Sequence, residues 1–441
     1  MREIKMSLRL ARIVMGLMLV FVLTACDALP LEVDWSWLTG ATEPAPVTTA
    51  LPKSETTPEI EVDITPTPSG PPASLTIWLP PDMDPEGGDK ASALLKAQLD
   101  GFAVEYGITI KTRVKNNKGP GGLLDALTAT SAAAPSVLPD IIVLSRDDLE
   151  TAALKSLVYS MDGKTTVIDE VDWFPYAREL ALIQGSLYGM PFTGDALGII
   201  YRNDIINPAP NSWFGLNTTT SVIAFAANDP QANVTLALYK AAGGAVRDNQ
   251  RRPMLEVQPL TDVLNLYKQS VDIAAFRELV LQLQNEEQAW LAYNNEQAQA
   301  AMVPVSTYLQ QKPENTSMIP IPAVKDFTLT TGSGWVWALA TGQPERQALS
   351  VALMEKLSES AFLSAWNEAY GGMPPRPSAL DAWQDASVRS MISQISVMTV
   401  LKPSSSITAS LGPVIRDAVI QVLRDNVEPA VAAQKAVESV R

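Results

Sequence analysis

The chain has 441 residues, a formal net charge of −15, no histidine and one cysteine. The acidic excess argues against nucleic acid as a partner, because nucleic acid binds clustered lysine and arginine. Without histidine the chain lacks the most common general base and metal ligand, so Ser-His and Cys-His catalysis and histidine-containing zinc sites are excluded. A chain of this length exceeds what one core usually supports, and we expect two lobes.

The first 25 residues have the composition of a secretory signal peptide. Four basic residues precede an apolar run over 13–23, which is too short to span a bilayer comfortably. The run ends in Leu-Thr-Ala-Cys at 23–26, which resembles the end of a bacterial lipoprotein signal, where the cysteine becomes the lipidated N-terminus. We expect residues 1–25 to be removed and Cys26 to anchor an exported protein to the outer face of the cytoplasmic membrane. An ordinary signal peptide with a coincidental cysteine is the alternative.

Residues 26–73 predict a tether between the lipid and the folded domain. They are rich in proline and threonine, as in Thr-Pro-Thr-Pro at 65–68. Such a composition favours an extended, solvated chain over a packed element. At ~3.1 Å per residue in polyproline II, the segment is long enough to hold the domain well away from the membrane.

The folded part is expected to begin with alternating strands and helices. Strands are predicted over 74–79, 108–114 and 139–144, with helices over 91–106 and 121–131 between them. This order indicates an α/β fold with a mostly parallel sheet and helices on both faces, and a mixed α+β arrangement is the alternative. Ligands of open sheets bind beyond the carboxyl ends of the strands, here just after residues 79 and 144.

The remainder of the chain is mainly helical by pattern. Two segments between the helices, 188–201 and 327–340, are rich in β-branched and aromatic residues. We predict that these two strands cross between the lobes. The predicted helices of this part are 262–267, 274–293, 346–370 and 411–440.

Several sequence blocks occur in the order typical of one protein family. The most specific is Leu-Tyr-Gly-Met-Pro-Phe-Thr-Gly-Asp at 187–195, followed by Ile-Tyr-Arg-Asn at 200–203. The other blocks are 75–78, 139–142, 241–244, 296–302, 334–335 and 370–376. Together they resemble the bacterial extracellular solute-binding lipoproteins of the carbohydrate ABC-importer type, which are maltose-binding-protein-like (family 1 solute-binding). The resemblance runs from about Leu75 to Val440.

The resemblance implies a helix-rich, type II-like periplasmic-binding-protein fold with two lobes joined by hinge crossover strands. It places the first lobe at 74–193 and 330–382, and the second lobe at 194–329 and 383–441. It also implies a function, in which a monomer without catalytic activity, cofactor or metal closes over a sugar. The sugar would then pass to the permease subunits of an ABC transporter.

Candidate ligand residues follow from the chemistry of sugars, which present flat apolar faces and rings of hydroxyls to aromatic, carboxylate, amide and guanidinium groups. By the resemblance, Asp195 at the first crossover is expected to face sugar hydroxyls, and Trp335 and Tyr308 to stack on a sugar ring. The further candidates are Asp82, Ser145 and Asp147 at strand ends, Tyr370 and Arg376 at the cleft rim, and Asn233, which precedes the Gly-Gly turn at 243–244 at a spacing that the resemblance associates with ligands. Each group of candidates also has a structural explanation, such as helix capping for an aspartate, core packing for Trp335 or a salt bridge for Arg376.

The chain departs from the sugar-binding pattern at two places. Leu144 and the segment 404–412 carry no aromatic residue where several oligosaccharide binders have one. This argues against a long linear oligosaccharide as ligand. Three alternative functions stay open. The same fold could bind a polyamine, a polyol or a phosphorylated polyol, or the lipoprotein could sense a ligand without a transport role. The third alternative is an enzyme that acts on glycans with two carboxylates such as Asp147 and Asp195.

Overall fold

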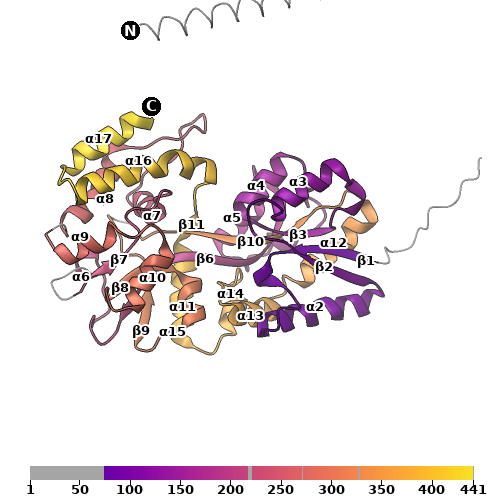
Figure 1. Ribbon diagram of the computed structural model, residues 1–441. Coiled ribbons are helices and arrows are strands. Elements are labelled where there is room, and N and C mark those ends of the chain that lie inside the picture. The colour runs from indigo at the N-terminus through magenta and orange to yellow at the C-terminus, as the bar shows by residue number, and fades with distance from the viewer. Residues whose placement is uncertain (1–73, 217–220, 271, 326–327, 441) are drawn as a thin grey trace, which may run out of the picture. The chain divides into compact units, whose positions relative to one another are not determined.

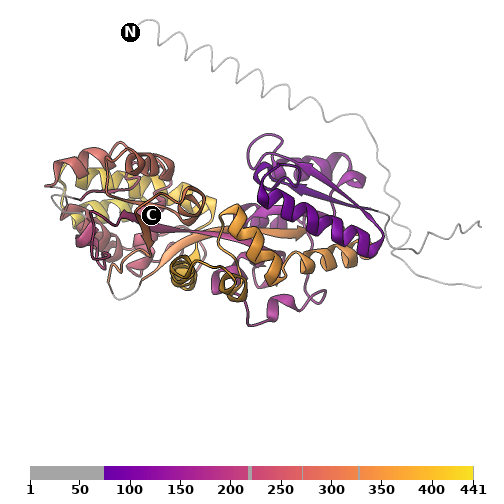
Figure 2. The ribbon, with the colours of Figure 1, turned by 90° about the horizontal axis from the view of Figure 1, so that it is seen from below.

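The computed structural model describes residues 74–440 apart from 217–220, 271 and 326–327. The expected signal peptide (1–25), Cys26 and the tether (26–73) lie outside the described residues. The described elements form the helix-rich, two-lobe α/β architecture that the sequence predicts (Figure 1). In Figure 2 the early helices of one lobe and the C-terminal helices of the other lie on opposite sides of the connecting strands.

The first lobe is built on the predicted parallel strands. β1 lies between β2 and β3 and runs parallel to both. Figure 1 shows α3 and α4 on one side of these strands and α2 on the other. Helix α2 begins where the Asp89 side chain accepts a hydrogen bond from the Ser92 N–H, and it ends at Gly107 with a φ of 65°. The elements of this part are β1 (Ser74–Leu79), α2 (Lys90–Tyr106), β2 (Thr109–Val114), α3 (Leu123–Ala133), β3 (Ile141–Ser145), α4 (Arg146–Leu154), α5 (Pro175–Ala181), β4 (Leu182–Ile183) and β5 (Ser186–Leu187).

Two long strands connect the lobes, as the sequence predicts for 188–201 and 327–340. The first half of β6 (Gly189–Arg202) pairs with β10 (Thr330–Leu339), and β10 in turn pairs with β3 of the first lobe. The second half of β6 pairs with β8 (Ala300–Pro304) and β9 (Thr316–Ile319). Each half of β6 therefore belongs to a different part of the sheet.

The sheet is mixed, whereas the sequence predicts a mostly parallel one. Among the named strands, β10 runs antiparallel to β3 and β6, and β6 runs antiparallel to β8 and β9. The cause is the return of the chain, because β10 enters the sheet of the first lobe from the second lobe and so runs against β3. Parallel pairing is confined to β1 with β2 and β3, β7 with β8, and β10 with β11.

Three segments predicted as largely helical each contain two helices. The segment 274–293 forms α9 and α10, and α10 begins where the Asn285 side chain accepts a hydrogen bond from the Gln288 N–H. The segment 346–370 forms α12 and α13, and 411–440 forms the end of α16 and α17. The remaining elements are α6 (Trp213–Leu216), β7 (Ile223–Ala224), α7 (Asn233–Ala241), α8 (Val257–Lys268), α9 (Ala274–Val280), α10 (Glu286–Asn294), α11 (Val305–Gln311), α12 (Pro344–Lys356), α13 (Ser360–Tyr370), α14 (Pro377–Asp381), α15 (Ala386–Met398), β11 (Thr399–Leu401), α16 (Ser405–Leu423) and α17 (Pro429–Val440).

Buried side chains form two hydrophobic clusters. The first cluster contains β1, β3 and the helices around them, and it extends to Tyr293 of α10 and to Ile392 and Ile395 of α15. The second cluster contains α7, α8, α16 and α17, with Phe225 stacked on Tyr267 at a centroid distance of 4.9 Å. The division of the chain into lobes at residues 193, 329 and 382 stays a prediction.

A buried ion pair fixes the start of β1 to α12. Asp140 is 2% exposed and accepts hydrogen bonds from the Arg346 guanidinium, with 2.6 Å between Arg346 Nε and Asp140 Oδ1. The same guanidinium donates to the Ser74 carbonyl, and the Thr76 N–H donates to Asp140. Removing the carboxylate would leave the Arg346 charge without its partner.

We therefore expect Asp140→Ala to lower the free energy of unfolding by roughly 3 kcal/mol, at the low end for a buried pair because Arg346 is partly exposed. Urea denaturation followed by tryptophan fluorescence measures this change. Asp100→Ala, which breaks only an exposed pair with Lys96, is the matched control and should have little effect. Equal effects of the two variants would contradict a stabilising role for the buried pair.

Candidate functional site

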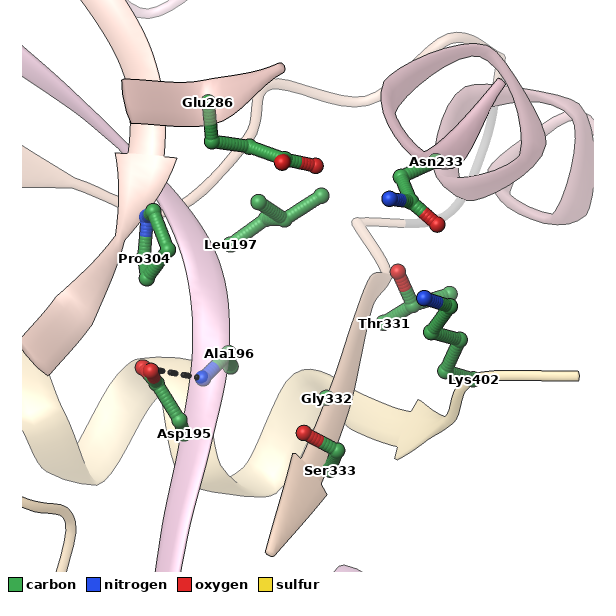
Figure 3. Close-up of a pocket in the computed structure, with 10 residues that line it drawn as sticks. All are labelled: Asp195, Ala196, Leu197, Asn233, Glu286, Pro304, Thr331, Gly332, Ser333 and Lys402. Atoms are coloured by element: carbon green, nitrogen blue, oxygen red, sulfur yellow. Dashed lines mark hydrogen bonds between the residues drawn. The ribbon is translucent and has the colours of Figure 1, made fainter. Parts of the chain in front are cut away.

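A cavity of about 200 Å³ lies where the two crossover strands meet the second lobe, and we call it the hinge pocket (Figure 3). Two stretches of crossover strand supply most of its lining, and the first residues of α7 and α10 face it from the second lobe. The residues that line the hinge pocket are Asp195, Ala196, Leu197, Asn233, Glu286, Pro304, Thr331, Gly332, Ser333 and Lys402.

Strand register places polar groups on one face of the crossover and glycines on the other. Ser333 lies opposite Asp195, and Gly334 lies opposite Gly194. Successive residues of a strand point to opposite faces, so the two glycines face away from Asp195 and Ser333. A Cβ atom at Gly194 would lie 2.4 Å from Tyr176 Oη of α5. The close approach of α5 therefore requires glycine on its side and leaves the polar side to the pocket.

The carboxylate of Asp195 is held by donors from two elements. Oδ1 accepts hydrogen bonds from the backbone N–H groups of Ala196 (2.9 Å) and Ser306 (3.1 Å). Oδ2 accepts one from the Ser306 hydroxyl at 2.5 Å. Burial raises the pKa of Asp195, and the hydrogen bonds from Ser306 oppose this rise. The group is thus oriented, and its remaining lone pairs can accept hydrogen bonds from a ligand.

The other walls offer a mixed set of polar groups. Asn233 opens α7, and its buried Oδ1 has no hydrogen-bond partner within the described part of the chain. Lys402 donates to Gln231 Oε1 over 3.1 Å, and Glu286 directs its carboxylate toward the pocket in Figure 3. Hydroxyls of Thr331 and Ser333 complete the lining, which contains no aromatic residue. Such a surface suits a small solute with several hydroxyl or amino groups.

Of the residues predicted from the sequence, Asp195 and Asn233 are brought together in the hinge pocket. Trp335 follows Ser333 by two positions on β10, so it shares the face of Ser333 and lies half-buried against the first cluster. Its neighbour Trp337 is fully buried and packs against Phe192, with ring centroids 4.7 Å apart. Trp335 therefore borders the side of the crossover on which the pocket opens.

Tyr308 lies on α11, two residues after Ser306. It lines a separate cavity of about 200 Å³ together with Trp383 and Asp385. Burial raises the pKa of the Tyr308 hydroxyl. Helix α11 therefore contacts Asp195 through Ser306, whereas Tyr308 of the same helix lines the separate cavity.

Five predicted residues have protein partners outside the hinge pocket. Ser145 accepts a hydrogen bond from the Asp148 N–H and caps α4, and Asp147 accepts one from the Ser405 hydroxyl at 2.6 Å. The Tyr370 hydroxyl donates to Asp82 over 2.6 Å.

Arg376 is the fifth of these and is buried among acidic and aromatic neighbours. It forms ion pairs with Glu170 (2.6 Å) and Asp172 (3.5 Å) and lies over the Trp173 ring at 4.0 Å from its centroid. These contacts match the salt-bridge explanation given for Arg376 from the sequence.

Sequence reasoning missed several groups of the pocket. The sequence contains a signal for two of them, because each lies two residues before a predicted ligand residue. Ser306 precedes Tyr308, and Ser333 precedes Trp335. Glu286 and Lys402 carry no local signal, since the pocket gathers them from α10 and from the chain after β11. Among the described residues, no group of three or more metal-ligating side chains occurs, and no helix is both long and apolar enough to traverse a bilayer.

Comparison with known proteins assigns the family. The family model described as bacterial extracellular solute-binding protein matches residues 97–389. The chain belongs to the bacterial extracellular solute-binding proteins. A search of curated proteins gave no match.

Solved structures share the two-lobe fold of this solute-binding protein. A cyclic α-maltosyl-1,6-maltose-binding protein from Arthrobacter globiformis has a TM-score of 0.68 at 13% identity, over 84% of this chain and 98% of that chain. The sugar-binding protein MalE from Xanthomonas citri has a TM-score of 0.67 at 16% identity, over 83% and 96%. An ABC transporter solute-binding protein from Thermotoga lettingae, bound with α-D-tagatose, has a TM-score of 0.60 at 16% identity, over 84% and 99%. These matches confirm the predicted fold class.

The buried carboxylate of Asp195 leads to a prediction about pH. A raised pKa in the folded state means that folding favours the protonated form of Asp195. The contribution of this group to the free energy of unfolding is therefore fully present below its unfolded-state pKa. It is lost as pH rises through the folded-state pKa. Asp195→Asn removes this titration. We expect the free energy of unfolding of the parent to rise relative to Asp195→Asn as pH falls from 7 to 4. Urea denaturation at several pH values measures the difference, and a difference independent of pH would contradict the raised pKa.

Proposed function

We propose that the protein is a lipid-anchored, extracytoplasmic solute-binding protein that captures a sugar between its lobes and delivers it to an ABC transporter permease. The observation that carries this proposal is the Asp195 carboxylate, which Ser306 orients on the crossover strand at the edge of the hinge pocket. An oriented, acceptor-only group suits the hydroxyl pairs of a sugar. The related folds include a cyclic α-maltosyl-1,6-maltose-binding protein and a solute-binding protein bound with α-D-tagatose, and both support the same ligand class.

The size of the hinge pocket favours a small saccharide. Its volume of about 200 Å³ is below the ~300–1,000 Å³ typical of sites for drug-sized ligands. The lining lacks an aromatic platform, and Trp335 is the nearest aromatic residue along β10. We therefore propose a mono- or disaccharide over a long linear oligosaccharide, with Trp335 stacking on one face of the ring.

A polyamine is the second candidate, and one observation favours it. The pocket contains two carboxylates, Asp195 and Glu286, against one ammonium group, Lys402, which already donates to Gln231. A cationic solute would neutralise this excess. The same fold would then serve a different ligand class, which a ligand screen distinguishes directly.

Binding in this arrangement needs no chemical step. Contacts of a solute with groups of both lobes exist only when the lobes are close together, so the solute shifts the population toward the closed form. The permease, or a sensor protein, would then read the position of the lobes.

The first test is a thermal-shift screen against mono- and oligosaccharides, polyols, polyamines and phosphorylated polyols. A solute at 100-fold excess over its dissociation constant adds about 2.7 kcal/mol of stability, which a melting curve resolves. We expect a shift with a small saccharide that Asp195→Ala and Trp335→Ala abolish. Asp100 is an exposed aspartate on α2, distant in sequence from the residues of the hinge pocket. Asp100→Ala is therefore the matched control and should retain the shift. A shift with polyamines alone would replace the sugar, and no shift with any class would contradict the proposed function.

The lipid anchor has its own test. Because Cys26 is the only cysteine, Cys26→Ser leaves no residue for thioether lipidation. We expect the parent to incorporate radiolabelled palmitate and to fractionate with membranes, and the variant to incorporate no label. A parent that carries no label but fractionates with membranes as Cys26→Ser does would contradict lipid anchoring and indicate a retained apolar segment.

A further inference from the structure

A polar contact joins the two lobes away from the crossover strands. Ser405, in the first turn of α16, donates its hydroxyl hydrogen to Asp147 Oδ2 over 2.6 Å. Asp147 lies in the first turn of α4, whose Leu149 is buried in the first cluster, whereas α16 buries Leu411 in the second cluster. Figure 1 shows α4 and α16 facing each other across the crossover. The hydrogen bond thus ties together two elements that are rooted in different cores.

Charges near this contact both favour and oppose the approach of the lobes. Lys240 of α7 is close enough to Glu179 of α5 for the two opposite charges to interact, although burial lowers the pKa of Lys240. Arg247 donates to the Ser404 hydroxyl over 2.6 Å beside the contact, and its charge opposes that of Arg146 on α4. Both an attraction and a repulsion between charged side chains therefore act across the interface.

One partner of the contact is close in sequence to the hinge pocket, and the other is close to a crossover strand. Ser405 follows the pocket residue Lys402 by three positions, and Asp147 follows Ser145, which pairs with Trp335 of β10. Crossover strands alone leave two lobes free to rotate about the hinge. A hydrogen bond between α4 and α16 restricts this rotation. It thereby limits the distance between the two lobes on either side of the hinge pocket.

We propose that Asp147 and Ser405 are positioning residues, whose hydrogen bond raises the population of the closed arrangement and with it the apparent affinity of the hinge pocket. The effect on affinity rests on the proposed binding function, whereas the effect on lobe position does not. The apparent dissociation constant is the intrinsic one divided by the closed fraction. A partly exposed hydrogen bond of ordinary strength changes the ratio of closed to open forms two- to tenfold. Asp147 then acts through the position of the lobes, which differs from the direct ligand contact predicted from the sequence.

The experiment measures the distance between the lobes by double electron–electron resonance without added solute. Spin labels are placed at Val104→Cys on α2 and Val431→Cys on α17, both well exposed, in the mature chain carrying Cys26→Ser. We expect Ser405→Ala and Asp147→Ala each to raise the ratio of open to closed forms two- to tenfold, seen as a changed distance distribution. The double variant should show no more opening than either single variant, since one bond is lost in all three.

Two control variants separate the bond from general effects of substitution. Ser405→Thr keeps the hydroxyl and should restore the parent distribution. Ser410→Ala removes an exposed serine of the same helix whose hydroxyl donates only to the Ser406 carbonyl, and it should leave the distribution unchanged. Distributions of Ser405→Ala and Asp147→Ala identical to that of the parent would overturn the proposal.

Once a solute is identified, calorimetry tests the consequence for binding. Ser405 does not line the hinge pocket, so Ser405→Ala should weaken affinity by the same factor by which the distance distribution shows the closed fraction to fall. An altered distance distribution with unchanged affinity would overturn the link to binding. A protein that binds no solute would leave the distance result standing, so the two failures are distinguishable.

Discussion

The antiparallel pairing of β6 with β10 is the interaction on which the rest of the structure depends. Seven residue pairs join the two strands, and each strand continues into partners of its own, β8 and β9 for β6 and β3 for β10. The lobes are therefore joined by a backbone ladder instead of a loose linker. Glycines at 194 and 334 let α5 cover one face of the ladder, and the opposite face stays open for polar groups. The pairing of β6 with β10 thus both joins the lobes and forms one wall of the hinge pocket.

A carboxylate at this position is costly for stability, because burial disfavours its charge. The N–H and hydroxyl groups of Ser306 offset part of the cost and fix the direction of the Asp195 oxygens. The donors come from α11, which follows β8 of the second lobe directly, so the orientation is set by a rigid strand–helix junction. A solute that supplies further hydroxyl donors would complete the solvation of the carboxylate. Binding and the relief of a buried charge are then one event, which is a common compromise between stability and function.

The sequence predicts those parts of the protein that local pattern controls. The strands β1 to β3 and the two crossover strands follow from β-branched runs, and Asp195 and Asn233 from sequence blocks of the family. The breaks within long helical stretches are set by caps such as Asn285, whose side chain accepts a hydrogen bond at the start of the next helix, and a count of apolar residues does not register them. Glu286 and Lys402 escape prediction for another reason. They approach the pocket from segments more than a hundred residues apart, and only tertiary packing brings them together.

The strength of the contact between the lobes must match the task of a solute-binding protein. A ligand shifts a two-state equilibrium only by its differential affinity for the two forms, so a contact that closes the lobes by itself leaves the ligand nothing to change. A buried ion pair such as Asp140–Arg346, inside one lobe, is too strong for this purpose. The hydrogen bond between Ser405 and Asp147 is exposed to water, so its contribution is about 0.5–1.5 kcal/mol, below the ~1.5–3 kcal/mol of a stronger bond to a charged group. A bias of that size favours closure without deciding it, and the solute makes the final difference.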